Sequence, residues 1–310
     1  MTVSVYLSGT GNVGRNLIKL IFNKNLPVRI AGIENRKGQI IGDSISLSQY
    51  NAFMSNPHVF PKKENPEDLK FDIFVDMRTA SKTGASEKDT YLKMFESGKN
   101  LITANKSGLA NYWKEINSSM IENNRKILFE ATVAGGLPLF SVLRNSMNGF
   151  QCSYFQGIVN LTANFVMRMI REGHTYEDAC SLAIKEGIGE TDMSDDLLGI
   201  DSARKAVILS NAVFGQSLSL SDMKFGGMIR NSKENQMLLV TIRQNEEFYV
   251  QSDIVTLEKD HPFLKMGPMA MGYLAGFYNR STLMVSEDYD GPVETAGAVL
   301  SDILSFESIR

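Results

Sequence analysis

The residues with the clearest chemical potential are the acidic side chains between positions 190 and 205. This segment reads E-T-D-M-S-D-D-L-L-G-I-D-S-A-R-K, and its carboxylates are Glu190, Asp192, Asp195, Asp196 and Asp201. Carboxylates spaced so closely repel one another, so either water solvates them at the surface or a cationic group lies among them. The amine of a substrate is one such cation, which makes this segment a candidate amino-acid site.

The same segment ends in a lysine that could move protons. Asp201 and Lys205 are four residues apart and share one face of a helix. The pair could be a simple ion pair worth about 0.3–0.5 kcal/mol. Alternatively, Lys205 could act as an ammonium that stabilises the alkoxide formed when an aldehyde is reduced, and in the reverse direction could accept the hydroxyl proton.

A glycine-rich turn near the N-terminus indicates a dinucleotide site. The β-rich residues 3–8 lead into G-T-G-N-V-G, and a helical pattern of apolar residues follows; the motif consists of Gly9, Thr10, Gly11, Asn12, Val13 and Gly14. The first glycine permits the tight turn, the second lets the backbone approach a pyrophosphate, and the third allows close packing of helix and sheet.

The end of the next predicted strand bears on the choice of cofactor. Glu34 stands twenty residues past Gly14, where a carboxylate could accept a hydrogen bond from a ribose 2′-hydroxyl, which favours NAD. Arg36 and Lys37 follow directly and could hold the 2′-phosphate of NADP. The sequence leaves both cofactors open, with a slight preference for NAD.

Two further strand ends carry polar groups that could meet a cofactor. Lys106 follows the predicted strand 100–104, and groups beyond the carboxyl ends of parallel strands line the ligand crevice. Lys106 is therefore placed near a nicotinamide, unless it is an ordinary solvated loop lysine. By the same logic, Arg78 and Thr79 could reach the cofactor from the strand 73–76.

The elements that must position these residues predict an α/β protein. Strands at 3–8, 28–33, 73–76, 100–104 and 127–131 alternate with helices, which is typical of a parallel sheet wrapped by helices. A charged, proline-containing segment at 55–70 reads as surface loop. Beyond Pro138 the pattern becomes α+β; it comprises strands at 155–161 and 282–286, a hairpin at 238–242 and 247–250, and helices at 163–172, 176–186, 199–214 and 295–304. We predict a Rossmann-type NAD(P)-binding domain at 1–134 with 288–310, and an α+β catalytic and dimerisation domain at 135–287.

Composition narrows the class of partner. The chain has 310 residues, a net charge of −3 and no basic block, which argues against a nucleic-acid partner. The two cysteines, Cys152 and Cys180, have no metal-ligand spacing, so we expect reduced thiols in a cytoplasmic protein. No apolar run is long enough for a membrane span, and the N-terminus lacks the features of a signal peptide.

Taken together, these motifs resemble the homoserine dehydrogenase family over nearly the whole chain. The resemblance includes the glycine turn, T-A-N-K at 103–106, E-A-T-V-A-G-G-L-P at 130–138 and G-I-V-N-L-T-A-N at 157–164. It continues through the acidic segment ending in Lys205 and through T-A-G-A-V-L-S-D-I at 295–303. The acidic segment is the most specific of these elements.

The resemblance implies an NAD(P)-dependent interconversion of L-homoserine and L-aspartate 4-semialdehyde in threonine, methionine and isoleucine biosynthesis. By matching position, Glu190 would bind the substrate ammonium, Asp196 and Asp201 would orient the site, Lys205 would be catalytic, and Lys106 would be the second active-site lysine. An alkali-metal ion, Na⁺ or K⁺, would lie on backbone carbonyls at Glu130, Val133, Gly135 and Leu137. The resemblance also implies a homodimer paired through a sheet of the second domain, in a short form that lacks the regulatory domain of longer members.

Two positions depart from the family pattern. Leu161 stands where the family usually has glycine, in a segment expected to be a loop that closes on the substrate, and Met193 stands where it usually has proline. Leu161 motivates an alternative, namely a related dehydrogenase acting on another small amino or hydroxy acid. A catalytically inactive dinucleotide-binding homologue is a further alternative, against which the presence of both Lys106 and Lys205 argues.

Overall fold

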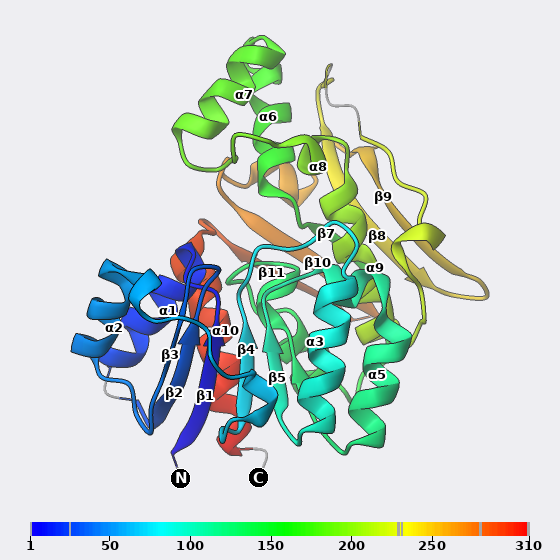
Figure 1. The fold of residues 1–310 in the computed structure, drawn as a ribbon. Helices are drawn as coiled ribbons and strands as arrows, with labels where there is room; N and C mark the ends of the chain where they lie inside the picture. The colour runs from blue at the N-terminus through cyan, green and yellow to red at the C-terminus, as the bar shows by residue number, and fades with distance from the viewer. Residues whose placement is uncertain (1, 25, 228–229, 231, 279–280, 309–310) are drawn as a thin grey trace. The chain divides into compact units, whose positions relative to one another are not determined.

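The chain folds into two compact units. In the computed structural model, the structure describes residues 2–24, 26–227, 230, 232–278 and 281–308. The first unit comprises Met1–Gly136 and Pro292–Arg310, and the second comprises Leu137–Gly291. Figure 1 shows that the red C-terminal helix packs beside the blue-to-cyan strands of the first unit.

The first unit is built on a six-stranded sheet in the order β3-β2-β1-β4-β5-β6. These strands are β1 (Val3–Ser8), β2 (Val28–Glu34), β3 (Gln39–Ile41), β4 (Ile73–Asp76), β5 (Asn100–Thr103) and β6 (Ile127–Leu128). All pairs are parallel except β2 with β3. The strand order reverses between β1 and β4, which is the point where doubly wound sheets bind ligands.

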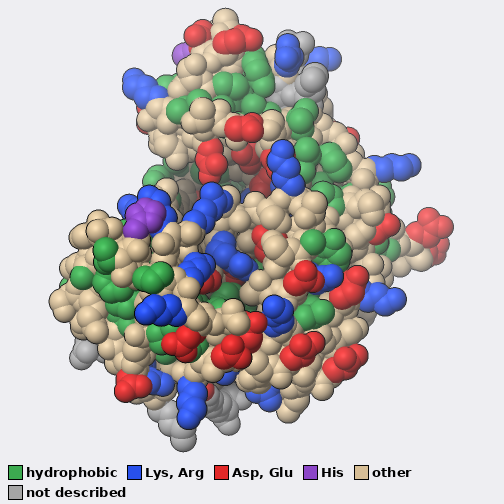
Figure 2. Space-filling view, viewed as in Figure 1, with side chains coloured by type: hydrophobic (Ala, Val, Ile, Leu, Met, Phe, Trp, Pro, Cys, Tyr) green, Lys and Arg blue, Asp and Glu red, His purple; other side chains and the backbone are tan. Residues whose placement is uncertain are grey.

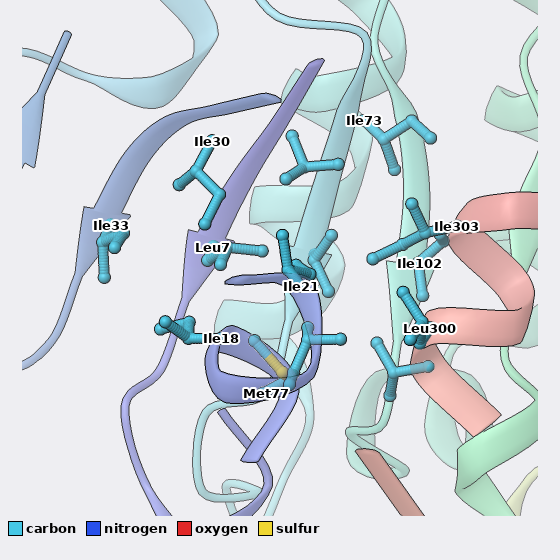
Figure 3. Close-up of a cluster of buried hydrophobic side chains, with 14 of the residues drawn as sticks. Leu7, Ile18, Ile21, Ile30, Ile33, Ile73, Met77, Ile102, Leu300 and Ile303 are labelled. Atoms are coloured by element: carbon cyan, nitrogen blue, oxygen red, sulfur yellow. The ribbon is translucent and has the colours of Figure 1, made fainter. Parts of the chain in front are cut away.

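Helices bury both faces of this sheet. The helices of the unit are α1 (Asn12–Asn23), α2 (Leu47–Ser55), α3 (Ala85–Glu96), α4 (Ser107–Asn111), α5 (Trp113–Glu122) and α10 (Pro292–Ser308). On one face, Leu7 of β1 packs with Ile18 of α1 and Leu300 of α10 (Figure 3). Tyr6 points to the opposite face because strand side chains alternate, and it stacks on Phe74 with ring centroids 5.8 Å apart.

The second unit contains a five-stranded antiparallel sheet in the order β11-β10-β7-β8-β9. Its strands are β7 (Cys152–Ile158), β8 (Gln236–Gln244), β9 (Phe248–Thr256), β10 (Met271–Phe277) and β11 (Thr282–Glu287). Its helices are α6 (Leu161–Arg171), α7 (Tyr176–Lys185), α8 (Ser194–Leu197) and α9 (Ile200–Phe214). Helices α6 and α9 contact the sheet, with Val166 and Leu238 in a shared core.

The structure confirms the predicted α/β fold class but corrects two element ends. The strand predicted at 127–131 ends at Leu128, because the backbone N–H of Glu130 donates to the Asp302 carboxylate, 2.9 Å away, and a 3₁₀ turn begins. The strand predicted at 155–161 ends at Ile158, because Asn160 caps α6. Strand β10 was not predicted; its two glycines lower its strand propensity.

Within the described part of the chain, no helix is long and apolar enough to cross a membrane. Cys152 and Cys180 are both free thiols.

Candidate active site

A cavity of about 720 Å³ opens at the carboxyl ends of β1 and β4 in the first unit. Gly9 begins the turn at the base of the cavity. Its φ is +109°, a backbone conformation that residues other than glycine rarely adopt. A Cβ atom at Gly9 would also lie 2.6 Å from the carbonyl of Met77. The backbone here can therefore pass close to β4 only with glycine.

The other two glycines of the turn differ in what surrounds them. A Cβ atom at Gly14 would lie 2.2 Å from the carbonyl oxygen of Gly9, so α1 packs tightly on the turn. At Gly11 a Cβ atom would meet nothing within 4 Å, which leaves open space at the start of α1. Gly9 and Gly11 line the cavity, whereas Asn12, Val13 and Gly14 are not among its lining residues. The open space at a helix N-terminus fits a pyrophosphate.

Glu34 lines the cavity but is already engaged. Its Oε1 accepts a hydrogen bond from the Ser8 hydroxyl at 2.6 Å, and its Oε2 accepts one from Lys62 Nζ at 2.8 Å. The carboxylate is buried, whereas the Lys62 side chain is 48% exposed. Lys62 was not predicted as a site residue, because it lies in the charged segment interpreted as a surface loop.

Basic side chains dominate the mouth of this cavity. Its cationic lining residues are Arg15, Arg36, Lys37, Lys62 and Arg78, and His58 lines it as well. Figure 2 shows Lys and Arg side chains gathered beside a histidine on the visible face. Glu34 and Glu87 are the acidic residues in the lining, and Glu34 is neutralised by Lys62. The cavity therefore suits a polyanionic ligand.

Arg78 is held by a buried network at the end of β4. Its Nε and Nη2 donate to the two carboxylate oxygens of Asp76 at 2.8 and 3.0 Å. Asp76 also accepts from the Tyr91 hydroxyl, which lies 2.9 Å from Thr103. Burial alone would lower the pKa of Arg78, but hydrogen bonding and the charge of Asp76 raise it. Arg78 is thus a fixed cation, and Thr79 beside it is an exposed lining residue.

Lys106 follows β5, as predicted, but it is the N-cap residue of α4 and not part of a loop, and it is partly buried. The buried carboxylate of Glu87 holds the residues near Lys106 in place. Glu87 accepts hydrogen bonds from Ser81 Oγ at 2.6 Å and from Asn105 Nδ2 at 3.1 Å. Ser81 follows β4 and Asn105 follows β5, so Glu87 ties two strand-end loops together. Lys106 is not among the residues that line the cavity.

In the second unit, Lys205 lies in a compact polar network at the start of α9. Its Nζ is 3.0 Å from Asp201 Oδ2 and donates to the carbonyl oxygen of Val159 at 2.5 Å. Asn160 Nδ2 donates to Asp196 Oδ1 at 2.9 Å and lies 3.5 Å from Asp201 Oδ2. The side chains of Lys205 and Asp201 are only 13% and 10% exposed. Asp201 and Lys205 are therefore more than the solvated surface pair that spacing alone allows.

The remaining acids of the segment have separate surroundings. Asp195 pairs with Arg204 Nη1 at 2.5 Å, and Asp192 accepts from the backbone N–H of Ser194 at 3.0 Å. Glu190 is exposed in the loop between α7 and α8. Arg204 and Lys205 thus supply cations for this acidic segment from within the chain.

One expectation about the turn before α6 was wrong. Leu161 is not in a loop; it is the first residue of α6, because Asn160 Oδ1 accepts from the backbone N–H of Ala163 at 2.8 Å and caps the helix. Asn160 was quoted in a motif but not predicted as a site residue. The polar cap residue before an apolar helical pattern was a signal that could have marked it.

The segment predicted for an alkali-metal ion is buried and irregular. Glu130 begins a 3₁₀ turn, Val133 follows it, and Gly135 has a φ of +56°. Leu137 is a buried residue at the beginning of the second unit. Among the described residues, no cluster of three or more His, Cys, Asp or Glu side chains could hold a metal ion.

The nucleotide-type sheet with its anion-binding cavity, together with a buried lysine–carboxylate network, defines an NAD(P)-dependent oxidoreductase of the two-unit α/β class. Comparison with known proteins agrees. The family model for homoserine dehydrogenase matches residues 138–304, and the model for its NAD-binding domain matches residues 9–130. The chain belongs to the homoserine dehydrogenase family.

Individual relatives are similar over their full length. The homoserine dehydrogenase of Sulfurisphaera tokodaii is 29% identical over 314 residues, which cover 97% of this chain and 98% of the relative. A crystal structure of homoserine dehydrogenase from Thermoplasma acidophilum has a TM-score of 0.91 at 37% identity, covering 99% of this chain and 100% of the other. A hyperthermophilic archaeal homoserine dehydrogenase in complex with NADPH has a TM-score of 0.86 at 26% identity, covering 100% and 99%.

Proposed function

We propose that this protein interconverts L-homoserine and L-aspartate 4-semialdehyde with a nicotinamide cofactor, as a step of amino-acid biosynthesis. The observation that carries the proposal is the pairing of Lys205 with Asp201 in a network that is largely excluded from solvent. A lysine amine held there by a carboxylate and a backbone carbonyl has a fixed direction. Such a group suits proton exchange with a substrate hydroxyl better than a mobile surface lysine does.

Each chain residue has one proposed task. Glu190, exposed in the loop before α8, would bind the substrate ammonium, and Asp196 and Asp201 would orient the site. Lys205 would give its proton to the developing alkoxide, or take the hydroxyl proton in the oxidative direction. Lys106 would add a second positive charge next to the reacting carbonyl. The bound nicotinamide would supply or accept the hydride.

We further propose that NADP is the preferred cofactor. Glu34 is neutralised by Lys62 and hydrogen-bonded to Ser8, which reduces its capacity to accept from a ribose hydroxyl. Arg36 and Lys37 are exposed at the same cavity and could contact a 2′-phosphate. The related archaeal enzyme in complex with NADPH supports the same preference.

We also propose a bound alkali-metal ion and a homodimer, both of which the family resemblance implies. An alkali-metal ion would bind backbone carbonyls of Glu130, Val133, Gly135 and Leu137, and exchange of Na⁺ and K⁺ for tetramethylammonium would then lower activity. We also propose a cytoplasmic homodimer formed through the sheet of the second unit.

The decisive assay measures turnover of L-homoserine with NADP⁺ and NAD⁺, and of L-aspartate 4-semialdehyde with the reduced cofactors. We expect turnover in both directions, with a higher kcat/KM for the phosphorylated cofactor. Lys205→Met should lower kcat by about 10²–10⁴-fold while cofactor binding persists. Absence of turnover with every pair would contradict the proposal and favour a dehydrogenase of another small amino or hydroxy acid, while an unaffected Lys205→Met variant would remove the proton-transfer role.

A further inference from the structure

The turn between β7 and α6 contacts three groups of the proposed proton-transfer network. Val159 accepts a hydrogen bond from Lys205 through its carbonyl oxygen, and the side chain of Asn160 reaches both Asp196 and Asp201. Asn160 is only 2% exposed, so its amide has no access to bulk water. A buried amide that joins two carboxylates controls where those carboxylates lie.

The helix cap fixes the direction of this amide. Asn160 Oδ1 accepts from the backbone N–H of Ala163, and this bond keeps the oxygen directed at the first turn of α6. An asparagine amide has one oxygen and one nitrogen on a planar group, so the nitrogen must then face the other way. It faces Asp196 and Asp201, where only a donor is tolerated. The cap and the acidic contact thus require the same orientation.

We propose that Asn160 is a positioning residue, which holds Asp196 and Asp201 in the geometry that Lys205 needs; this inference rests on the proposed function. An amide donates to a carboxylate without neutralising it, so Asp201 keeps its charge for Lys205. Arg204, the other cation of this region, pairs with Asp195 through its Nη1. Asn160 acts through the aspartates and does not itself touch the reacting atoms.

A double-mutant cycle between Asn160→Ser and Asp196→Ala tests this inference. Serine is as good a helix cap as asparagine but is too short to reach Asp196, so the substitution removes the donor and keeps the cap. Thr175→Ala is the matched control. Thr175 caps α7, and its Oγ1 accepts a hydrogen bond from the Asp178 N–H at 3.1 Å. The substitution therefore deletes a helix cap without removing a contact of the acidic network.

We expect Asn160→Ser to lower kcat for homoserine by about tenfold or more, with the KM for the cofactor unchanged. In the Asp196→Ala background the same substitution should lower kcat by less than about threefold, because the oxygen that accepts from Asn160 is already gone. Thr175→Ala should keep wild-type kcat. An unchanged kcat in Asn160→Ser, or losses that multiply in the double variant, would overturn the inference.

A readout independent of turnover separates this inference from the proposed function. Urea unfolding of the wild type, the two single variants and the double variant of the cycle can be followed by far-UV circular dichroism. The unfolding free energies should show the same coupling between positions 160 and 196. If Lys205→Met retains wild-type turnover, the proposed proton transfer fails whatever the cycle shows. If Lys205→Met is inactive but positions 160 and 196 are uncoupled in both measurements, only the role of Asn160 fails.

Discussion

At the scale of single residues, partners decide what a charged side chain can do. Glu34 has the sequence position of a ribose-binding acid, yet its carboxylate is held by Ser8 and Lys62. Lys62 comes from a segment that reads as an ordinary charged loop. The chemical character of the cavity therefore depends on a contact between residues far apart in the sequence.

Removing Lys62 should shift the cofactor preference toward NAD. In Lys62→Met, Glu34 loses its counter-ion and becomes available to a ribose hydroxyl, while a 2′-phosphate meets an unpaired carboxylate. We expect the ratio of kcat/KM for NADP⁺ over NAD⁺ to fall at least about tenfold, measured with homoserine at saturation. Lys63→Met is the control, because Lys63 is exposed and does not line the cavity. Equal ratios in the two variants would contradict the assignment.

Glu87 should stabilise the first unit in a pH-dependent manner. Burial alone would raise the pKa of Glu87, but hydrogen bonds from Ser81 and Ser86 outweigh it and lower the pKa. A carboxyl group with a lowered folded pKa adds stability above its unfolded pKa, about 4.3, and this stability is lost as pH falls through the folded value.

We therefore expect Glu87→Gln to lose about 1–3 kcal/mol of unfolding free energy at pH 7, with a smaller loss below about pH 4. Urea unfolding followed by the fluorescence of Trp113, the only tryptophan, reports on the unit that contains Glu87. Glu115→Gln, an exposed acid on α5, serves as the control and should change little. A pH-independent loss in Glu87→Gln would show that its ionised form has no special role.

At the scale of elements, helix α9 sets the position of the network that joins Asp201 and Lys205. Gly199, the N-cap residue directly before the helix, has a φ of +78°, and a Cβ atom there would lie 2.8 Å from the carbonyl oxygen of Gly226. Asp201 and Lys205 follow within the first two turns of the helix. A shift at Gly199 would therefore move both groups.

Alanine at Gly199 should destabilise the protein more than alanine at the other end of the same helix. Gly215 also has a positive φ, +68°, but nothing lies within 4 Å of a Cβ atom there. Gly215→Ala should cost about 1–2 kcal/mol for the left-handed conformation alone. Gly199→Ala should cost roughly 1–3 kcal/mol more because of the steric contact, and should also raise the KM for homoserine. Thermal unfolding and kinetics of both variants measure the difference. Equal losses of unfolding free energy in the two variants would show that the backbone at Gly226 moves aside without an energetic penalty.

At the scale of the whole molecule, one face of the five-stranded sheet carries aromatic, basic and apolar side chains that are exposed or half-buried. Arg243 lies 5.9 Å from the ring centroids of both Tyr154 and Tyr249 on this face, and Met284 on β11 is 40% exposed. Directly opposed residues of neighbouring strands share a face, which places Tyr249, Arg243 and Tyr154 in one row. Aromatic residues, arginine and methionine are the types enriched at protein interfaces.

We expect the protein to be a homodimer of about 69 kDa, twice the 34.4 kDa of one chain, in size-exclusion chromatography with light scattering. Arg243→Glu combined with Met284→Lys should yield monomer, because it places new charges in the interface. Glu115→Lys, a charge change on the first unit, should leave the dimer intact. A wild-type monomer would refute the proposed assembly.

The sequence by itself predicted the parallel strands of the doubly wound first unit, but not its antiparallel edge strand β3. Its short apolar strands, the glycine turn and the alternation with helices are local patterns, and β1 and β4 end at the predicted residues. Local signals were less complete in the second unit, where β10 was not predicted and β7 ended earlier than its apolar run suggested. Antiparallel strands rich in glycine depend on their neighbours for stability, so their own residues identify them poorly.

For the site, sequence spacing identified which groups could react, and Asp201 with Lys205 is the clearest case. Only the tertiary structure decided their partners. Lys62 reaches Glu34 across 28 positions, and Asn160 reaches Asp196 across 36, distances over which no helical or strand periodicity carries information. Charge and hydrogen bonding act through space. The acidic segment therefore obtains its hydrogen-bond partners from the turn between β7 and α6, which reaches Asp196 and Lys205 only when the chain is folded.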